Sequence, residues 1–213
     1  EAVENSADAI IEARKNDCKY KREIRIVVDK PEKKVLVIDD GFGFQNVQHV
    51  SEKPFKSLKR ADADYTGQFA RGLQAFRAFC NKLTFYTRRP KIPAGELGYM
   101  RTEKGISNQT VKIEYEADSI KVAAKHVDDK YFAEYTNAPH GSVAIYEDWR
   151  KGQFEKLRKE DVIRRIEHHF GELIRDGEIK IFVHEEQGKI RELGPAQARW
   201  YECQPKDYSQ FER

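Results

Sequence analysis

The chain has 213 residues, of which 39% are hydrophobic and 35% are charged, so we expect a soluble globular protein with its own core rather than a disordered chain. Its 39 basic and 36 acidic side chains leave a net charge of +3, which is too balanced to indicate nucleic-acid or anionic-membrane binding by itself. The three cysteines are widely spaced and odd in number, which argues against a disulfide framework or a zinc site and favours a reducing compartment.

The hydropathy of the chain predicts a protein that neither spans a membrane nor binds one. No apolar run approaches the ~18 residues of a membrane-spanning helix, and no charged and then apolar leader is present. We therefore expect a cytoplasmic protein, or a nuclear one if it is eukaryotic and associated with DNA.

The predicted elements begin with a helix over residues 1–16. Two strand-like runs follow at 23–28 and 35–38, and the second, a continuous apolar run, is expected at the centre of a sheet. Residues 44–66 are polar and without sustained periodicity, which is typical of a mobile lid. A helix over 71–81 and a strand over 83–87 come next.

The second half of the chain predicts more strands and one amphipathic helix. The helix covers 159–176 and ends at Gly177 as a C-cap. Its apolar face is formed by Ile163, Ile166, Phe170, Leu173 and Ile174. The strands are expected at 96–102, 109–115, 119–126, 142–147, 178–184 and 188–193. This order predicts an α+β sandwich of one sheet and one helical layer.

The first helix places polar side chains on one face. Glu1, Asn5, Asp8 and Glu12 are three or four residues apart, so they share that face. An ordinary amphipathic helix with its polar side in water has the same pattern.

A second motif follows the apolar strand 35–38 directly. Asp39 precedes Gly41 and Gly43, and a carboxylate held at the end of a buried strand can accept a hydrogen bond from an adenine amino group. Glycines let the backbone approach a flat base closely. A simple Asp-Gly hairpin turn is the alternative.

Two further motifs complete the set. The segment 67–72 is glycine-rich and opens a predicted helix, and both backbone N–H groups and a helix N-terminus suit phosphate oxygens. A flexible loop would have the same composition. The segment 140–143 places the hydroxyl of Ser142 at the start of a strand, where it can join Asp39 at the base.

In this order, the four motifs resemble the GHKL superfamily, whose Bergerat ATP-binding fold is shared by gyrase B, the ninety-kilodalton heat-shock chaperones, histidine kinases and MutL. The resemblance covers about residues 1–147. It implies a two-layer sandwich in which a mixed, mostly antiparallel sheet is covered on one face by helices. Residues 1–150 would form the ATP-binding domain, with a lid at about 44–66, and residues 151–213 would pack on that domain or complete it.

The resemblance also implies roles for individual residues. Glu1 would be the general base that activates the attacking water, and Asn5 would ligate Mg²⁺. Asp8 would support this face through water or magnesium. Asp39 would bind the adenine amino group with help from Ser142.

The glycines and the phosphate-binding segment have implied roles too. Gly41 and Gly43 would shape the base pocket. The remaining residues expected to bind the nucleotide, from the lid and the glycine-rich loop, are Lys59, Gly67, Phe69, Ala70 and Gly72. Ala70 stands where the family usually has glycine, which would weaken or rearrange phosphate binding if that position needs a positive φ.

The sequence leaves the branch, the client and turnover open. Segment 67–88 is similar to the heat-shock chaperone branch, whereas 55–59 is similar to the lid of MORC-type and topoisomerase VI B ATPases. The expected protein is a magnesium-dependent ATPase whose lid closure, with a possible ATP-dependent homodimer, drives a conformational change in a larger protein. The alternative is a nucleotide-binding regulatory or interaction domain without efficient hydrolysis. Duplex DNA and a client protein both remain as partners; Lys56, Lys59, Arg60, Arg88 and Arg89 are the cations that DNA would use.

Overall fold

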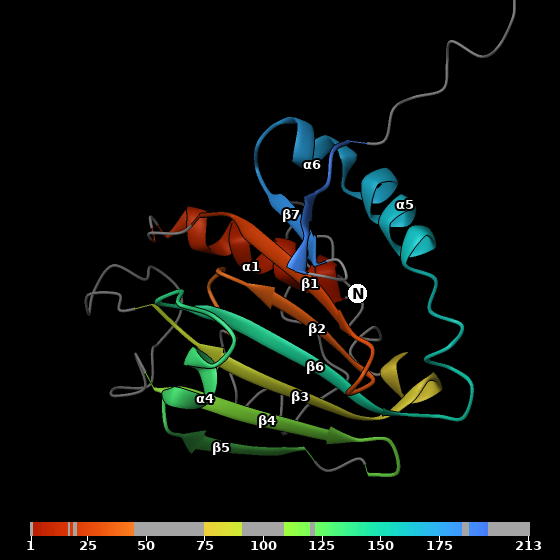
Figure 1. Ribbon diagram of the computed structural model, residues 1–213. Helices are drawn as coiled ribbons and strands as arrows, with labels where there is room; N and C mark the ends of the chain where they lie inside the picture. The colour runs from red at the N-terminus through yellow and green to blue at the C-terminus, as the bar shows by residue number, and fades with distance from the viewer. Residues whose placement is uncertain are drawn as a thin grey trace, which may run out of the picture.

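A computed structural model of the chain describes residues 2–16, 18, 21–44, 75–90, 109–119, 122–184 and 188–195. Its centre is an eight-stranded sheet with the order β5-β4-β3-β6-β2-β1-β7-β8 (Figure 1). The strands are β1 (Glu23–Asp29), β2 (Lys34–Asp39), β3 (Cys80–Arg88), β4 (Thr110–Glu116), β5 (Ala123–Val127), β6 (Gly141–Trp149), β7 (Lys180–His184) and β8 (Ile190–Glu192). The pair β1–β7 is parallel and every other neighbouring pair is antiparallel.

Among the described residues, α1 and α5 are the longer helices and the others are short. They are α1 (Ala2–Lys15), α4 (Lys130–Ala133), α5 (Lys159–His169) and α6 (Gly171–Arg175), with a 3₁₀ turn η1 at Phe76–Ala78. Helices together with a mixed eight-stranded sheet confirm the α+β class. No helix in the described part of the chain is both long and apolar enough to cross a membrane.

The sheet has two apolar faces because side chains alternate along each strand. The inner face carries Val37 and Ala144 and packs against Ala7 and Ile10 of α1. Helices α5 and α6 add apolar side chains to this same cluster. The outer face carries a smaller cluster, in which Phe132 of α4 packs against four residues of the sheet: Leu36, Ile38, Val143 and Ile145.

The sequence predicts one helical layer on one face of the sheet, whereas the structure also places the short helix α4 on the opposite face. Helices α1 and α4 lie on opposite sides of the sheet (Figure 1). Helix α4 is not predictable from the sequence, since a one-turn helix is too short to show a 3.6-residue period.

Eight of the expected strands are present, although their ends are shifted. They are the strands expected at 23–28, 35–38, 83–87, 109–115, 119–126, 142–147, 178–184 and 188–193. The one expected at 96–102 lies outside the described residues. Strand β2 lies between β6 and β1, as expected for a central strand.

Two helix predictions need correction. In the region expected to be a helix over 71–81, the described residues form η1 and then β3 from Cys80, so the helical prediction is wrong at its end. The helix expected over 159–176 is interrupted at Phe170, whose φ of −105° and ψ of 10° separate α5 from α6. Gly177 follows α6 with a φ of +69°, and the Glu178 N–H bonds to the Leu173 carbonyl, as in a glycine-terminated helix end.

Candidate functional site

Three polar side chains lie in a row across the ends of β2, β6 and β3. Asp39 pairs with Ser142 in the β2–β6 register, and Ser142 pairs with Thr87 in the β6–β3 register. Each lies two residues along its strand from an inner-face residue, which is Val37 for Asp39, Ala144 for Ser142 and Phe85 for Thr87, so all three point to the inner face beside α1. Strand register therefore brings Asp39 and Ser142 together.

The Asp39 carboxylate is buried and held by three donors. Its Oδ2 accepts the Ser6 hydroxyl of α1 at 2.8 Å, and its Oδ1 accepts the N–H groups of Gly41 at 3.0 Å and Ser142 at 3.2 Å. An ionised carboxylate offers about four lone-pair positions, so one acceptor position remains, on Oδ2. Asp39 is thus fixed in orientation and can still accept one more hydrogen bond.

Burial also changes the protonation of Asp39. Loss of solvent raises the pKa of this carboxyl from 3.8 to about 7, against the lowering effect of its hydrogen bonds from Ser6, Gly41 and Ser142. The neighbouring Asp40 charge raises it further. Asp39 therefore changes its charge near neutral pH.

Gly41 is packed against the first helix. A Cβ at this position would lie 2.6 Å from the carbonyl carbon of Ala9 and 2.8 Å from the Ile10 nitrogen. The Phe42 N–H also donates to the Ala9 carbonyl at 2.8 Å. The absence of a side chain at Gly41 thus lets α1 reach the end of β2, which is how Ser6 comes to touch Asp39.

Gly43 and Gly141 are constrained in a similar way. Gly43 has a φ of +75°, and a Cβ there would lie 2.7 Å from the Arg88 carbonyl oxygen. Gly141 has a φ of +133°, and its Cβ would lie 2.0 Å from the Asp39 carbonyl oxygen. Both positions therefore require glycine.

Two residues of the site were not singled out from the sequence. Ser6 was part of the first motif without a role of its own, and Thr87 was only the last residue of a predicted strand. Thr87 accepts the Phe44 N–H at 2.9 Å, and its hydroxyl is 3.3 Å from that of Ser142. The signal for both was a hydroxyl residue at an otherwise buried position, which is common in proteins and does not by itself indicate a site.

His140, which precedes Gly141, closes the site from the β6 side. It is buried, and its Nδ1 lies 2.7 Å from the Gly41 carbonyl oxygen. Because a carbonyl oxygen only accepts, Nδ1 carries the proton of this bond. The glycine turn after β2 is thus tied to the start of β6.

The polar residues of α1 differ in their exposure to solvent. Asn5 is exposed, whereas Asp8 is completely buried, so this face does not simply point into water. Glu12 accepts a hydrogen bond from the side chain of Asn16 at 3.1 Å. Six expected site residues lie outside the described residues: Glu1, Lys59, Gly67, Phe69, Ala70 and Gly72.

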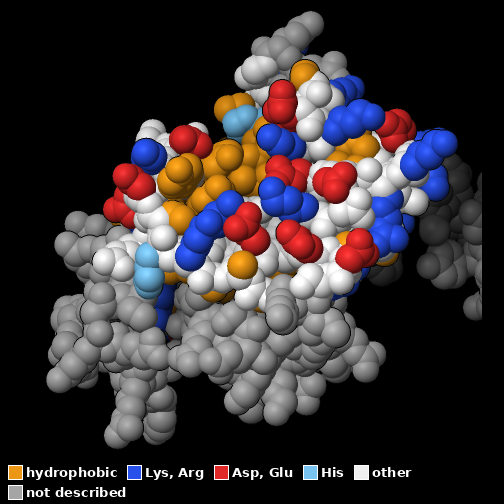
Figure 2. All heavy atoms as spheres, turned by 90° about the horizontal axis from the view of Figure 1, so that it is seen from below, with side chains coloured by type: hydrophobic (Ala, Val, Ile, Leu, Met, Phe, Trp, Pro, Cys, Tyr) orange, Lys and Arg blue, Asp and Glu red, His pale blue; other side chains and the backbone are white. Residues whose placement is uncertain are grey.

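The two arginines considered for DNA binding have partners within the chain. Arg88 is 2.7 Å from Asp129 and stacks over Phe132. Arg89 is partly buried over the ring of Phe42, and this burial lowers the pKa of its guanidinium. In the view of Figure 2, basic and acidic side chains are interspersed over the described surface around a hydrophobic area.

Comparisons with known proteins give no further assignment: no family model matches the chain, and a search of curated proteins finds no similar sequence. Among the described residues, no three His, Cys, Asp or Glu side chains are placed to hold a metal ion together.

Proposed function

We propose that this chain is an ATP-binding module of the Bergerat type, in which Asp39 recognises the adenine amino group. The observation that carries the proposal is the buried Asp39 carboxylate, oriented by Ser6, Gly41 and Ser142 and left with one acceptor position on Oδ2. An exocyclic amino group is a neutral donor that fits a single remaining acceptor. The tight glycines at 41, 43 and 141 hold this geometry in place.

The proposal extends to magnesium and to hydrolysis through the resemblance of the first motif. Asn5 would contribute an oxygen ligand to Mg²⁺, which would bridge and neutralise phosphate oxygens, and the exposure of Asn5 is compatible with that role. Glu1 would orient and deprotonate the attacking water. Support for binding comes from the geometry around Asp39, while support for turnover comes from the sequence alone.

Calorimetric titration with a nonhydrolysable ATP analogue and Mg²⁺ tests the binding site. Asp39→Asn should weaken binding by about tenfold or more, because the amide replaces one acceptor oxygen with an NH₂ that faces a donor in either orientation. Asp118→Asn removes the same charge from an exposed turn and should bind like the wild type. Equal affinity in all three proteins would refute the site.

Phosphate release separates the ATPase from the binding-only alternative. If the chain is an ATPase, Glu1→Gln should keep analogue affinity and lose turnover, while Glu32→Gln, in the exposed turn before β2, should keep both. A wild-type protein that binds the analogue without turnover above background would favour the regulatory domain.

A further inference from the structure

A pocket of about 370 Å³ opens on the outer face of the sheet, at the end where β1 begins and β2 finishes. Ile38 lines it from the sheet, and Arg25 is the direct partner of Ile38 in the β1–β2 register, so both side chains lie on the outer face. The loop between α4 and β6 forms the opposite wall with Thr136, Ala138 and Pro139. This volume suits a small organic molecule.

Asp39 lines this pocket as well as the nucleotide site proposed above, but the two sites use opposite faces of the sheet. The Asp39 carboxylate points to the inner face, where it meets Ser6 of α1, whereas Arg25 and Ile38 point to the outer face. A ligand held by Lys21 and Arg25 on the outer face therefore meets donors other than those that hold the Asp39 carboxylate.

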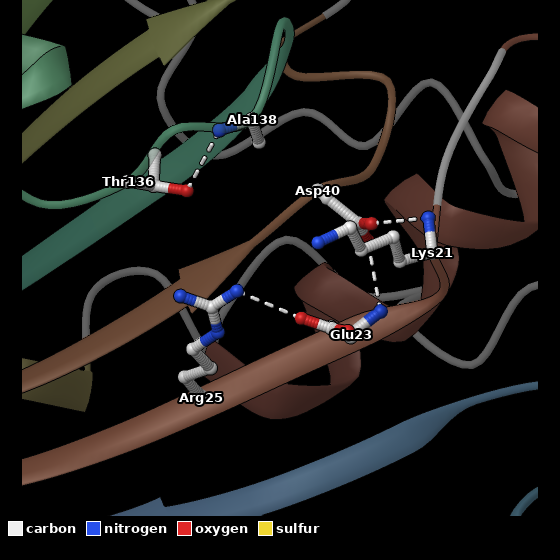
Figure 3. Close-up of polar contacts among 6 residues, drawn as sticks. All are labelled: Lys21, Glu23, Arg25, Asp40, Thr136 and Ala138. Atoms are coloured by element: carbon white, nitrogen blue, oxygen red, sulfur yellow. Dashed lines mark hydrogen bonds and ion pairs between the residues drawn. The ribbon is translucent and has the colours of Figure 1, made fainter.

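The basic side chains around the pocket retain free donors. In Figure 3 the side chains of Lys21 and Arg25 converge on the space beside the loop that carries Thr136 and Ala138. The Nη2 of Arg25 donates a hydrogen bond to the Glu23 carboxylate at 2.8 Å, which uses one of the two terminal nitrogens of Arg25. Lys21 is exposed, and within the part of the chain that the structure describes its ammonium makes no ion pair.

The acidic side chains are occupied by contrast. Asp40 is buried and accepts the main-chain N–H groups of Lys21 and Glu23, which compensates its charge from within the protein. One carboxylate oxygen of Glu23 is taken by Arg25. A cation in this pocket would find few unused acceptors, while an anion would find the donors of both Lys21 and Arg25.

The opposite wall is held in a fixed shape. The Thr136 hydroxyl accepts the Ala138 N–H at 3.1 Å (Figure 3). The Thr136 N–H donates to the Phe132 carbonyl at 3.3 Å. Thr136 itself is buried, and its hydroxyl hydrogen is available to a ligand. A rigid wall lowers the entropic cost of binding.

We infer that this pocket binds a small organic anion, a carboxylate or phosphate monoester, whose charged group meets Lys21 and Arg25 and whose apolar part lies against Ile38 and Pro139. The probes for its test are phenyl phosphate and benzoate, with neutral benzamide and inorganic phosphate for comparison. Titration followed by ¹H–¹⁵N chemical shifts should show saturable changes at residues 21–25 and 136–139 with the two organic anions. Inorganic phosphate should bind more weakly and benzamide should not bind.

Variants identify the groups responsible. Lys21→Gln changes an exposed side chain, and it should weaken the binding of phenyl phosphate about tenfold. Arg25→Gln should have at least the same effect. Lys125→Gln removes an equal charge from exposed β5 at the far side of the sheet and should bind like the wild type.

Two outcomes would overturn the inference: unchanged affinity in Lys21→Gln, or benzamide binding as tightly as benzoate. Lys21→Gln should bind the ATP analogue with Mg²⁺ as the wild type does, because Lys21 is no part of the nucleotide site proposed above. The anion pocket can therefore fail while the nucleotide site stands, and the nucleotide site can fail while the pocket stands.

Discussion

Asp39 combines burial with three hydrogen-bond donors, and this combination gives its carboxyl group a measurable pH signature. Its donors orient the carboxylate, but they do not fully replace the water it has lost, so its pKa rises from 3.8 to about 7. A carboxyl with a raised pKa in the folded state makes the protein more stable when protonated. That stabilisation is fully present below the unfolded-state pKa of 3.8 and is lost as the pH rises through about 7.

Urea unfolding at pH 5 and pH 8 measures this effect. The wild type should lose on the order of 2 kcal/mol more stability than Asp39→Asn over that interval, because asparagine cannot ionise. The variant controls for every other group that titrates in the same range. Equal pH dependence in the two proteins would mean that Asp39 is not buried as the structure shows.

Gly141 tests a different feature of the same site, the close approach of β6 to the end of β2. Gly141→Ala would place a Cβ 2.0 Å from the Asp39 carbonyl oxygen and should cost about 3 kcal/mol or more in unfolding free energy. Gly152→Ala is the matched control: its φ of +72° is also positive, but no atom lies within 4 Å, so it should cost only about 1 kcal/mol. Similar costs at both positions would show that the close approach is absent.

At this scale the sequence identified the motif residues better than their surroundings. Asp39, Gly41 and Ser142 were identified because an acid, two glycines and a hydroxyl stand directly at strand ends. Their convergence follows from register, which local pattern does not determine. The roles of Ser6 and Thr87 follow only from the packing of α1 and β3 beside Asp39 and Ser142. The complete burial of Asp8 argues against the alternative interpretation, in which the whole polar face of the helix points into water.

Among the elements, the strands were predictable and the short helical pieces were not. Alternating polar and apolar residues, and continuous apolar runs, reflect the burial of a strand directly, so the strands could be located from the sequence. Their ends could not, because the pattern fades where burial ends. The interruption at Phe170 leaves the apolar stripe of the helix unchanged, since Phe170 stays buried. Cys80 fits a helical stripe and a buried strand equally well, and tertiary pairing with Trp149 determines that it is in a strand.

Helix α4 has only four residues, but it stabilises the fold by burying one large side chain. Phe132 is completely buried in the outer-face cluster, so Phe132→Ala should lower the unfolding free energy by about 3–4 kcal/mol. Tyr131, next to it, is 40% exposed and stacks on Tyr86 with ring centroids 6.1 Å apart.

Tyr131→Ala is the control for Phe132→Ala in thermal or urea unfolding, and it should cost about 1 kcal/mol or less. If both variants lost the same stability, α4 would be a surface turn rather than the cover of the outer face.

For the whole molecule, the most consequential contact is one that no local pattern predicts. Strand β7, more than a hundred residues after β1, pairs with β1 in parallel, with Ile24 opposite Ile181. The inner-face cluster contains Ile163, Ile166 and Ile179 together with Ile10 and Ile26. The described residues after 150 thus contribute to the same sheet and the same core as α1, even though the motifs that resemble an ATP-binding fold end before them.

This shared core predicts the behaviour of a shortened chain. A chain ending at residue 150 would expose the β1 edge and uncover the apolar side chains of Ile24 and Ile26, which are now almost completely buried. It should lose the dispersed ¹H–¹⁵N spectrum and the cooperative unfolding transition of the full chain. A chain ending at residue 195 keeps every residue that the structure describes and should retain both properties. Cooperative unfolding of the 150-residue chain would instead mean that β7 and α5 pack onto a core that is already complete without them.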